Sequence, residues 1–158
     1  VKTFLTQLKN GVYKGGERLP TESEMAEKFG IRVTADGWEN RSGCKGPVVY
    51  LCNHMSTMET IMLPPALLCF GPLSYVAKAS LAHLPFLEKA AARTGMVPIG
   101  RKSPREDLMQ VFNEGVARIR EGRSILIFPQ GSRERVFSRK LYSSIGAKLA
   151  EKAGVPVK

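Results

Sequence analysis

The chain has 158 residues, with a hydrophobic fraction of 43% and a charged fraction of 24%, which is typical of one folded domain and excludes a disordered chain. Its net charge of +10 predicts an acidic partner: nucleic acid, an anionic membrane surface or an acidic carrier protein. The three cysteines lack CxxC spacing and only two histidines accompany them, so we expect a reduced environment and no metal site.

Residues 1–30 are expected to form a short N-terminal helical segment in two pieces, broken by Gly15-Gly16 and Leu19-Pro20. The first piece contains both apolar residues and lysines, as an amphipathic helix does, so it could lie at a membrane interface or pack on the main domain. No secretory signal peptide is recognisable at the start.

Strands and helices alternate from residue 31 onwards. The patterns predict strands at 31–35, 48–51, 95–99 and 124–128, and helices at 57–68, 84–93, from Ser103 to Gly122, and at 144–153. Ser103-Pro104 supplies a helix cap and a first-position proline.

This alternation predicts an α/β fold, a mostly parallel mixed sheet flanked by helices. We assign residues 31–158 to this domain. A further strand begins at Val155-Pro156-Val157 and stops at Lys158, so we expect a C-terminal portion of the domain to be absent.

Two short motifs follow apolar, strand-like runs. The first runs from Asn53 to Glu59 and places His54 and Glu59 five positions apart, while the second runs from Phe128 to Arg133. Ligands of an α/β sheet gather outside the carboxyl ends of its strands. We therefore expect both motifs at one edge of the sheet.

These motifs resemble those of the glycerolipid acyltransferase family, of the bacterial 1-acylglycerol-3-phosphate acyltransferase type, from about Val33 onwards. The family's His-x4-Asp motif is matched by His54 and Glu59, and its Phe-Pro-Glu-Gly-Thr-Arg motif by residues 128–133. An intermediate motif ending in arginine is matched by residues 95–101. The chain departs from the family in having Glu59 for aspartate, Gln130 for glutamate and Ser132 for threonine.

The resemblance implies transfer of a fatty acyl group from an acyl thioester to the free hydroxyl of a lysophospholipid such as 1-acylglycerol-3-phosphate, giving phosphatidic acid. His54 is the candidate base, because imidazole can take a proton near neutral pH. Glu59 would hold the other ring nitrogen. Backbone N–H groups around Gly131 would stabilise the oxyanion. We expect direct transfer rather than a covalent intermediate on Ser56.

The resemblance also implies that Arg101 and Arg133 bind the acceptor phosphate, which suits guanidinium geometry. Gln130 and Ser132 are candidate acceptor-binding residues, and Gln130 can both accept and donate a hydrogen bond. Either arginine could instead be a solvated surface residue.

The expected co-substrate is acyl-CoA or acyl-ACP, with no bound cofactor, no metal and no nucleic acid. A basic surface would be drawn to anionic lipids and could recruit acyl carrier protein. We therefore expect a peripheral or interfacially anchored protein at the cytoplasmic face of the cell membrane.

Two alternatives remain. The substitutions at Glu59 and Gln130 are compatible with a lipid-binding relative that does not catalyse transfer. Residues 16–31 resemble the opening of a GntR-type winged helix-turn-helix, and the positive charge suits DNA. However, the residues that follow predict a strand and a turn instead of a recognition helix, which makes DNA binding the weaker hypothesis.

Overall fold

The structure is a computed structural model, and the part of the chain that it describes is residues 30, 37, 40, 44–56, 58–83, 91, 94–101, 103–134, 136 and 138–158. The expected N-terminal helical pieces, the strand at 31–35 and most of the helix at 84–93 lie outside these residues. The assignment of residues 1–30 and 31–158 to separate units therefore stays a prediction.

The centre of the fold is a four-stranded sheet with the order β1-β4-β2-β3. Every described strand pair is parallel, so the carboxyl ends of the strands share one edge. The strands are β1 (Val49–Leu51), β2 (Leu73–Lys78), β3 (Val97–Ile99) and β4 (Ser124–Ile127). The predicted α/β class with a parallel sheet is confirmed.

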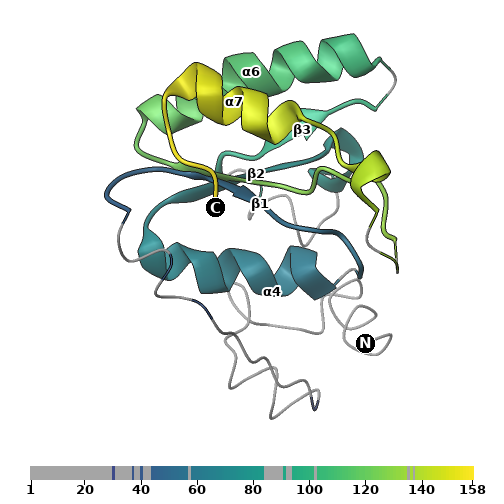
Figure 1. The fold of residues 1–158 in the computed structure, drawn as a ribbon, viewed down its shortest axis with the longest axis horizontal. Coiled ribbons are helices and arrows are strands. Elements are labelled where there is room, and N and C mark those ends of the chain that lie inside the picture. The colour runs from purple at the N-terminus through teal and green to yellow at the C-terminus, as the bar shows by residue number, and fades with distance from the viewer. Residues whose placement is uncertain are drawn as a thin grey trace.

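Helices cover both faces of the sheet, as Figure 1 shows, with α4 on one side and α6 and α7 on the other. The helices are α4 (Met58–Leu67), α6 (Pro104–Arg120) and α7 (Ile145–Ala153). Short 3-10 turns lie at η1 (Leu68–Phe70), η2 (Ala79–Leu81) and η3 (Arg139–Leu141). Among the described residues, no helix is both long enough and apolar enough to cross a lipid bilayer.

The ends of α6 and α7 follow the signals in the sequence. The Ser103 side chain accepts a hydrogen bond from the Glu106 N–H, and Pro104 occupies the first helical position. Gly154 ends α7 with a φ of 68°, a left-handed conformation that glycine adopts without steric cost. The predicted N-terminal cap of α6 is confirmed.

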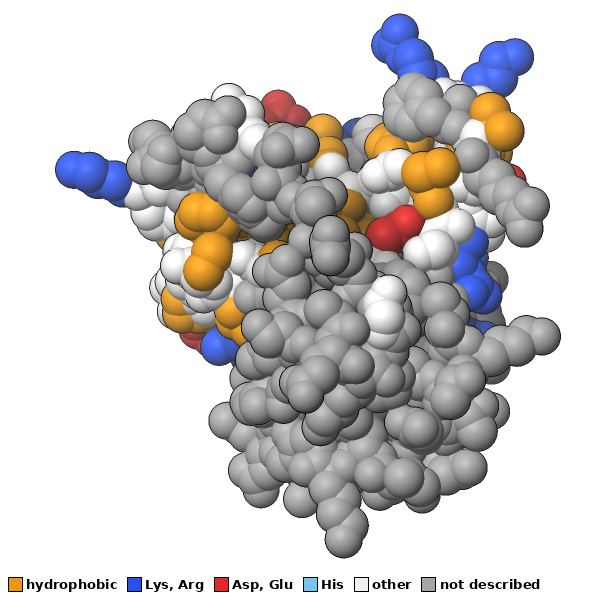
Figure 2. All heavy atoms as spheres, turned by 90° about the horizontal axis from the view of Figure 1, so that it is seen from below, with side chains coloured by type: hydrophobic (Ala, Val, Ile, Leu, Met, Phe, Trp, Pro, Cys, Tyr) orange, Lys and Arg blue, Asp and Glu red, His pale blue; other side chains and the backbone are white. Residues whose placement is uncertain are grey.

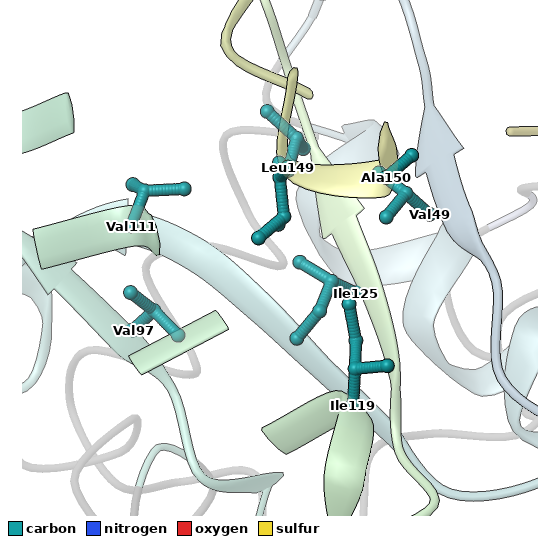
Figure 3. Close-up of a cluster of buried hydrophobic side chains, with 8 residues drawn as sticks. Val49, Val97, Val111, Ile119, Ile125, Leu149 and Ala150 are labelled. Carbon is teal, nitrogen blue, oxygen red and sulfur yellow. The ribbon is translucent and has the colours of Figure 1, made fainter. Parts of the chain in front are cut away.

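The main core lies between the sheet and the pair α6 and α7, where Figure 3 shows side chains from all three meeting. On β4, Ile125 and Ile127 belong to this cluster, while Leu126 belongs to a second cluster beneath α4. Successive strand residues point to opposite faces, so burial of all four β4 residues means that both faces of this strand are covered.

Strand β2 was not predicted, although it lies in the middle of the sheet. Its first residues, Leu73 and Ser74, are fully buried. The Ser74 hydroxyl donates to the Thr94 carbonyl at 2.6 Å and accepts from Arg123 Nε at 2.8 Å. Arg123 also donates to the Leu73 carbonyl. Arg123 is thus half-buried and structural.

The segment after α7 pairs with the free edge of β1. Val157 forms a parallel bridge with Val49, and the Lys158 N–H donates to the Val49 carbonyl at 2.9 Å. The strand expected to begin at 155–157 is therefore present as one bridge beside β1.

Candidate active site

The two halves of the site are brought together by the pairing of β1 with β4. The registers Val49 with Ile125 and Leu51 with Ile127 align the two strands in parallel, so the residues that follow them emerge side by side. The chain after Leu51 carries His54, and the chain after Ile127 carries residues 128–133. The expected meeting of the two motifs at one sheet edge is found.

His54 and Glu59 are in direct contact. The distance from His54 Nδ1 to Glu59 Oε2 is 2.9 Å, and both side chains are about four-fifths shielded from solvent, at 20% and 23% exposure. The additional methylene of glutamate does not prevent the contact. This leaves Nε2 of the imidazole as the ring nitrogen that a substrate hydroxyl can approach.

Glu59 also holds the start of α4. Its Oε1 accepts from the Ser56 N–H at 2.8 Å, and both of its oxygens lie 2.9 Å from the Met55 nitrogen. Ser-x-x-Glu is the sequence signature of a capping box, in which the glutamate satisfies an orphan N–H at the helix start. Sequence analysis missed this second role, although the signature is present at residues 56–59.

Residues after β4 fix His54 from the other side. The His54 ring stacks on Phe128, with 4.6 Å between centroids and an interplanar angle of 30°. The His54 N–H donates to Gln130 Oε1, and the His54 carbonyl accepts from the Glu134 N–H at 2.9 Å. The ring is therefore oriented by both motifs, and the contribution of Phe128 had no signal in the sequence beyond its place in the motif.

Gln130, a candidate acceptor-binding residue, is buried at 7% exposure, and its Oε1 accepts a hydrogen bond from the His54 N–H. Its Nε2 is buried and has no hydrogen-bond partner among the described residues. A carboxylate at this position would present no such donor, because an ionised carboxylate only accepts. The amide thus ties the two motifs together and leaves both N–H donors of Nε2 unused in the described part of the chain.

Gly131 lies at the turn after β4 with a φ of 69°, where glycine avoids the strain that a side chain would bring. The Arg101 Nη2 atom lies 3.6 Å from the position that a Cβ would occupy on Gly131. Within the described residues, the Gly131 N–H donates to no backbone carbonyl. Gly131 and Arg101, from two different motifs, are thus neighbours.

The remaining candidates, Ser132 and Arg133, are both exposed. The Ser132 hydroxyl donates to Glu134 Oε1 at 3.2 Å. Arg133 follows Gly131 by two positions and extends the same turn. Neither residue lines the two cavities described below, although both follow Gly131 directly in the chain.

Two cavities open at this edge of the sheet. One, of about 150 Å³, lies beside His54 on the α4 side, and the other, of about 360 Å³, lies between the sheet and the helices α6 and α7. Their linings are mostly apolar. Both cavities share the residues Val76, Ile99, Arg101, Phe128 and Gly131. An apolar ligand with a polar end at Arg101 suits this shape.

Cys52 lies two residues before His54 but is not a competing nucleophile. Burial raises the pKa of the Cys52 thiol to about 11, and the negative charge of Glu59 adds to the rise. The thiol is thus protonated at neutral pH. In the described part of the chain, no group of three or more His, Cys, Asp or Glu residues is arranged to hold a metal ion.

The sequence and the fold are similar to those of known proteins. The chain is 38% identical over 128 residues to the 1-acyl-sn-glycerol-3-phosphate acyltransferase of Pseudomonas aeruginosa, an alignment that covers 81% of this chain and 48% of that protein. It is 30% identical to the enzyme of the same name from Borreliella burgdorferi, over 81% of this chain and 50% of that protein. The chain spans about half the length of these curated relatives.

The fold has a counterpart in the crystal structure of the 1-acyl-sn-glycerophosphate (LPA) acyltransferase PlsC from Thermotoga maritima. The TM-score is 0.66 at 22% identity, and the match covers 94% of this chain and 56% of that chain. The family model Acyltransferase matches residues 14–157. With this match spanning nearly all of the sequence, the chain belongs to the Acyltransferase family.

Proposed function

We propose that the protein transfers a fatty acyl group from an acyl thioester to the free hydroxyl of a lysophospholipid such as 1-acylglycerol-3-phosphate, giving phosphatidic acid in phospholipid biosynthesis. The observation that carries the proposal is the contact between His54 and Glu59 beside an apolar cavity. The activity named in the matching relatives supports it.

In this reaction His54 Nε2 accepts the proton of the acceptor hydroxyl while the hydroxyl oxygen attacks the thioester carbonyl carbon. Glu59 keeps the proton of the ring on Nδ1 and stabilises the imidazolium that forms. The tetrahedral intermediate collapses by breaking the carbon–sulfur bond. The departing sulfur takes the proton from His54, so an ester and a free thiol are formed and the base is restored.

The carbonyl oxygen becomes negatively charged in the intermediate and requires a hydrogen-bond donor. The Gly131 N–H is our candidate, because Gly131 lines both cavities and its N–H donates to no backbone carbonyl in the described residues. A Cβ at this position would narrow the space toward Arg101.

We assign the acceptor phosphate to Arg101 and Arg133. The Arg101 guanidinium reaches the Gly131 turn and lines both cavities, and Arg133 follows Gly131 by two positions in the chain. Ser132, exposed and next to Gly131 in the chain, is assigned to the acceptor as well. Gln130 acts mainly by holding the His54 backbone through its Oε1. Its Nε2 has no partner among the described residues and is the group that could donate to the acceptor.

The acyl donor is acyl-CoA or acyl-ACP, and the acceptor is drawn from a membrane. Val136 is 76% exposed and Leu141 is 45% exposed, close to the exposed Arg139 and Lys140. Figure 2 shows apolar and basic side chains together around η3, at upper right. Apolar side chains within a basic rim suit an anionic lipid surface. We propose a location at the cytoplasmic face of the cell membrane.

The test is thiol release from a long-chain acyl thioester with lysophosphatidic acid present, using the full-length protein. We expect acceptor-dependent release that falls at least about a thousandfold in His54→Ala, because the base is lost. Glu59→Gln keeps an oxygen for the N–H groups of α4 but loses the charge beside His54, so release should fall about a hundredfold while the Tm changes little.

Folded, membrane-bound protein that releases no thiol with any lysophospholipid acceptor would contradict the proposal. A lipid-binding relative without turnover would then be the better account, and the buried amide of Gln130 in place of the family glutamate is the observation that favours it. The stretch that suggested DNA binding lies almost entirely outside the described residues, and the family match covers it.

A further inference from the structure

Arg101 has an unusual backbone. Its φ is 58°, and it is the only non-glycine residue with a positive φ in the part of the chain that the structure describes. A side chain in the left-handed region crowds the following carbonyl, so such a conformation persists only where neighbouring contacts enforce it. Neighbouring contacts must therefore hold the Arg101 backbone in this conformation.

Asp107 provides that contact from the first turn of α6. Its Oδ1 accepts from the Gly100 N–H at 2.9 Å, and its two oxygens accept from the Arg101 N–H at 3.2 and 3.0 Å. The carboxylate thus binds two successive N–H groups of the strained turn. Asp107 is itself fixed, because its own N–H donates to the Ser103 carbonyl at 3.0 Å.

The direction of the Arg101 side chain follows from this turn. From its left-handed backbone, Arg101 places Nη2 over Gly131, 3.6 Å from the position of an added Cβ. Arg101 lines both cavities, whereas Asp107 lines only the one between the sheet and the helices α6 and α7. An extended backbone at Arg101 would send the guanidinium elsewhere.

We infer that Asp107 is a positioning residue for Arg101: its carboxylate holds the Gly100-Arg101 turn in the left-handed conformation from which the guanidinium meets the acceptor phosphate. The inference rests on the proposed function only where it has Arg101 bind a phosphate. The hydrogen bonds from the Gly100 and Arg101 N–H groups to the Asp107 carboxylate, hereafter the clamp, do not depend on it. Asp107 acts through the backbone of Arg101 and touches no reacting atom.

Steady-state kinetics on the full-length protein separates this role from a general structural one. Asp107→Ala should raise the KM for lysophosphatidic acid about tenfold and leave the KM for the acyl thioester within about twofold, because only the phosphate contact is misplaced. Asp107→Asn keeps the acceptor oxygen that serves both N–H groups, so its KM should stay within about threefold of wild type.

Glu106→Gln is the matched control. Glu106 is exposed in the same turn of α6, so its substitution removes one negative charge from the helix start without touching the clamp. The kinetics of this variant should match wild type. If Glu106→Gln and Asp107→Ala raised the acceptor KM equally, the effect would be one of charge and the positioning role would be excluded.

A thermal unfolding cycle tests the clamp without reference to activity. Glycine adopts a positive φ without strain, whereas Arg101 is strained and can relax once the clamp is removed. Asp107→Ala loses the same hydrogen bonds in both backgrounds but relieves strain only in the Arg101 background, so it should lower the Tm clearly more in Arg101→Gly than in the Arg101 background. Equal losses in both backgrounds would overturn the clamp.

The outcomes distinguish the two hypotheses. If Arg101→Gly leaves the acceptor KM unchanged, the phosphate role of Arg101 fails, while the unfolding cycle still decides the clamp. If Arg101→Gly raises the acceptor KM and Asp107→Ala does not, the phosphate role stands and the positioning role of Asp107 is wrong.

Discussion

At the scale of single residues, Glu59 combines two tasks that usually fall to separate side chains. It binds His54 Nδ1, and it also accepts from the N–H groups of Met55 and Ser56 at the start of α4. A carboxylate that already accepts from a helix start is held in one rotamer, so it presents a fixed oxygen to the imidazole. Glu59 therefore both supports the start of α4 and orients the His54 ring.

The part of the site that the sequence predicts is the part that lies within short motifs. The five-residue spacing of His54 and Glu59 and the glycine after β4 can be recognised along the chain. The hydrogen bond from His54 to Gln130 joins residues 76 positions apart. Such a contact depends on the register of β1 with β4, which no local pattern specifies.

Gln130→Ala should weaken catalysis, because the His54 backbone N–H loses its acceptor and the imidazole loses one of its supports. We expect kcat to fall about a hundredfold, as small displacements of a catalytic group commonly do. Gln130→Glu keeps an acceptor oxygen and should recover activity to within about tenfold of wild type. Kinetics of the two variants checks this, and equal losses in both would contradict the tether.

Cys52 should resist alkylation. Burial raises the pKa of its thiol to about 11, so the reactive thiolate is scarce at pH 7 and becomes abundant only as the pH rises toward that value. We expect Cys52 to react with maleimide at least about a hundredfold more slowly than the exposed Cys69 at pH 7. Mass spectrometry of labelled peptides measures both rates in one sample.

The variant Glu59→Gln provides the control for this prediction, because the charge of Glu59 contributes to the raised pKa of Cys52. Labelling of Cys52 should accelerate in the variant while labelling of Cys69 stays constant. Rapid labelling of Cys52 at pH 7 in the wild type would show that the thiol is not held protonated.

At the scale of elements, β2 shows where the sequence was insufficient. The strands β1 and β4 consist mostly of apolar residues, and α6 carries apolar residues at spacings of three and four, so the sequence predicts the type of each element. Strand β2 contains serine, alanine and lysine, and its burial comes from neighbours on both sides, β4 and β3. Tertiary contacts here decide what local propensity does not.

Ser74→Ala should destabilise the protein through this strand. The change removes the donor to the Thr94 carbonyl and the acceptor of Arg123 Nε, in a fully buried place. Leaving such groups unsatisfied costs about 1–3 kcal/mol each, so we expect a loss of about 2–4 kcal/mol in the free energy of unfolding. Urea denaturation measures it.

Ser80→Ala is the matched control, since Ser80 lies in η2 and is exposed. Its effect on the free energy of unfolding should be within about 0.5 kcal/mol. A similar loss in both variants would indicate that the Ser74 network contributes nothing specific to β2.

At the scale of the whole molecule, the net charge of +10 and the exposed residues near η3 predict binding to anionic vesicles. Replacing Arg139 and Lys140 by serine should weaken binding about tenfold to thirtyfold, because each basic residue contributes about 1 kcal/mol near such a surface. Co-sedimentation of the full-length protein with vesicles that contain phosphatidylglycerol checks this, and binding should also fall as salt is raised.

Replacing Arg120 and Lys152 by serine removes the same charge from the other end of the helices. Both residues are exposed and lie in the last turns of α6 and α7, away from the strand ends that carry the site. We expect less than about a threefold change in vesicle binding, since only charges close to the surface contribute. Equal losses in the two double variants would rule out an oriented membrane face at η3.

The parallel pairing of β1 with β4 also governs when the molecule becomes competent during folding. His54 and its partners after β4 meet only when a long loop has closed, whereas α6 needs only local contacts. Helical signal should therefore return early in refolding and acyl transfer late. The recovery of activity then reports on the last long-range contacts to form. A partly unfolded state in which β1 and β4 are separated is inactive even if its helices persist.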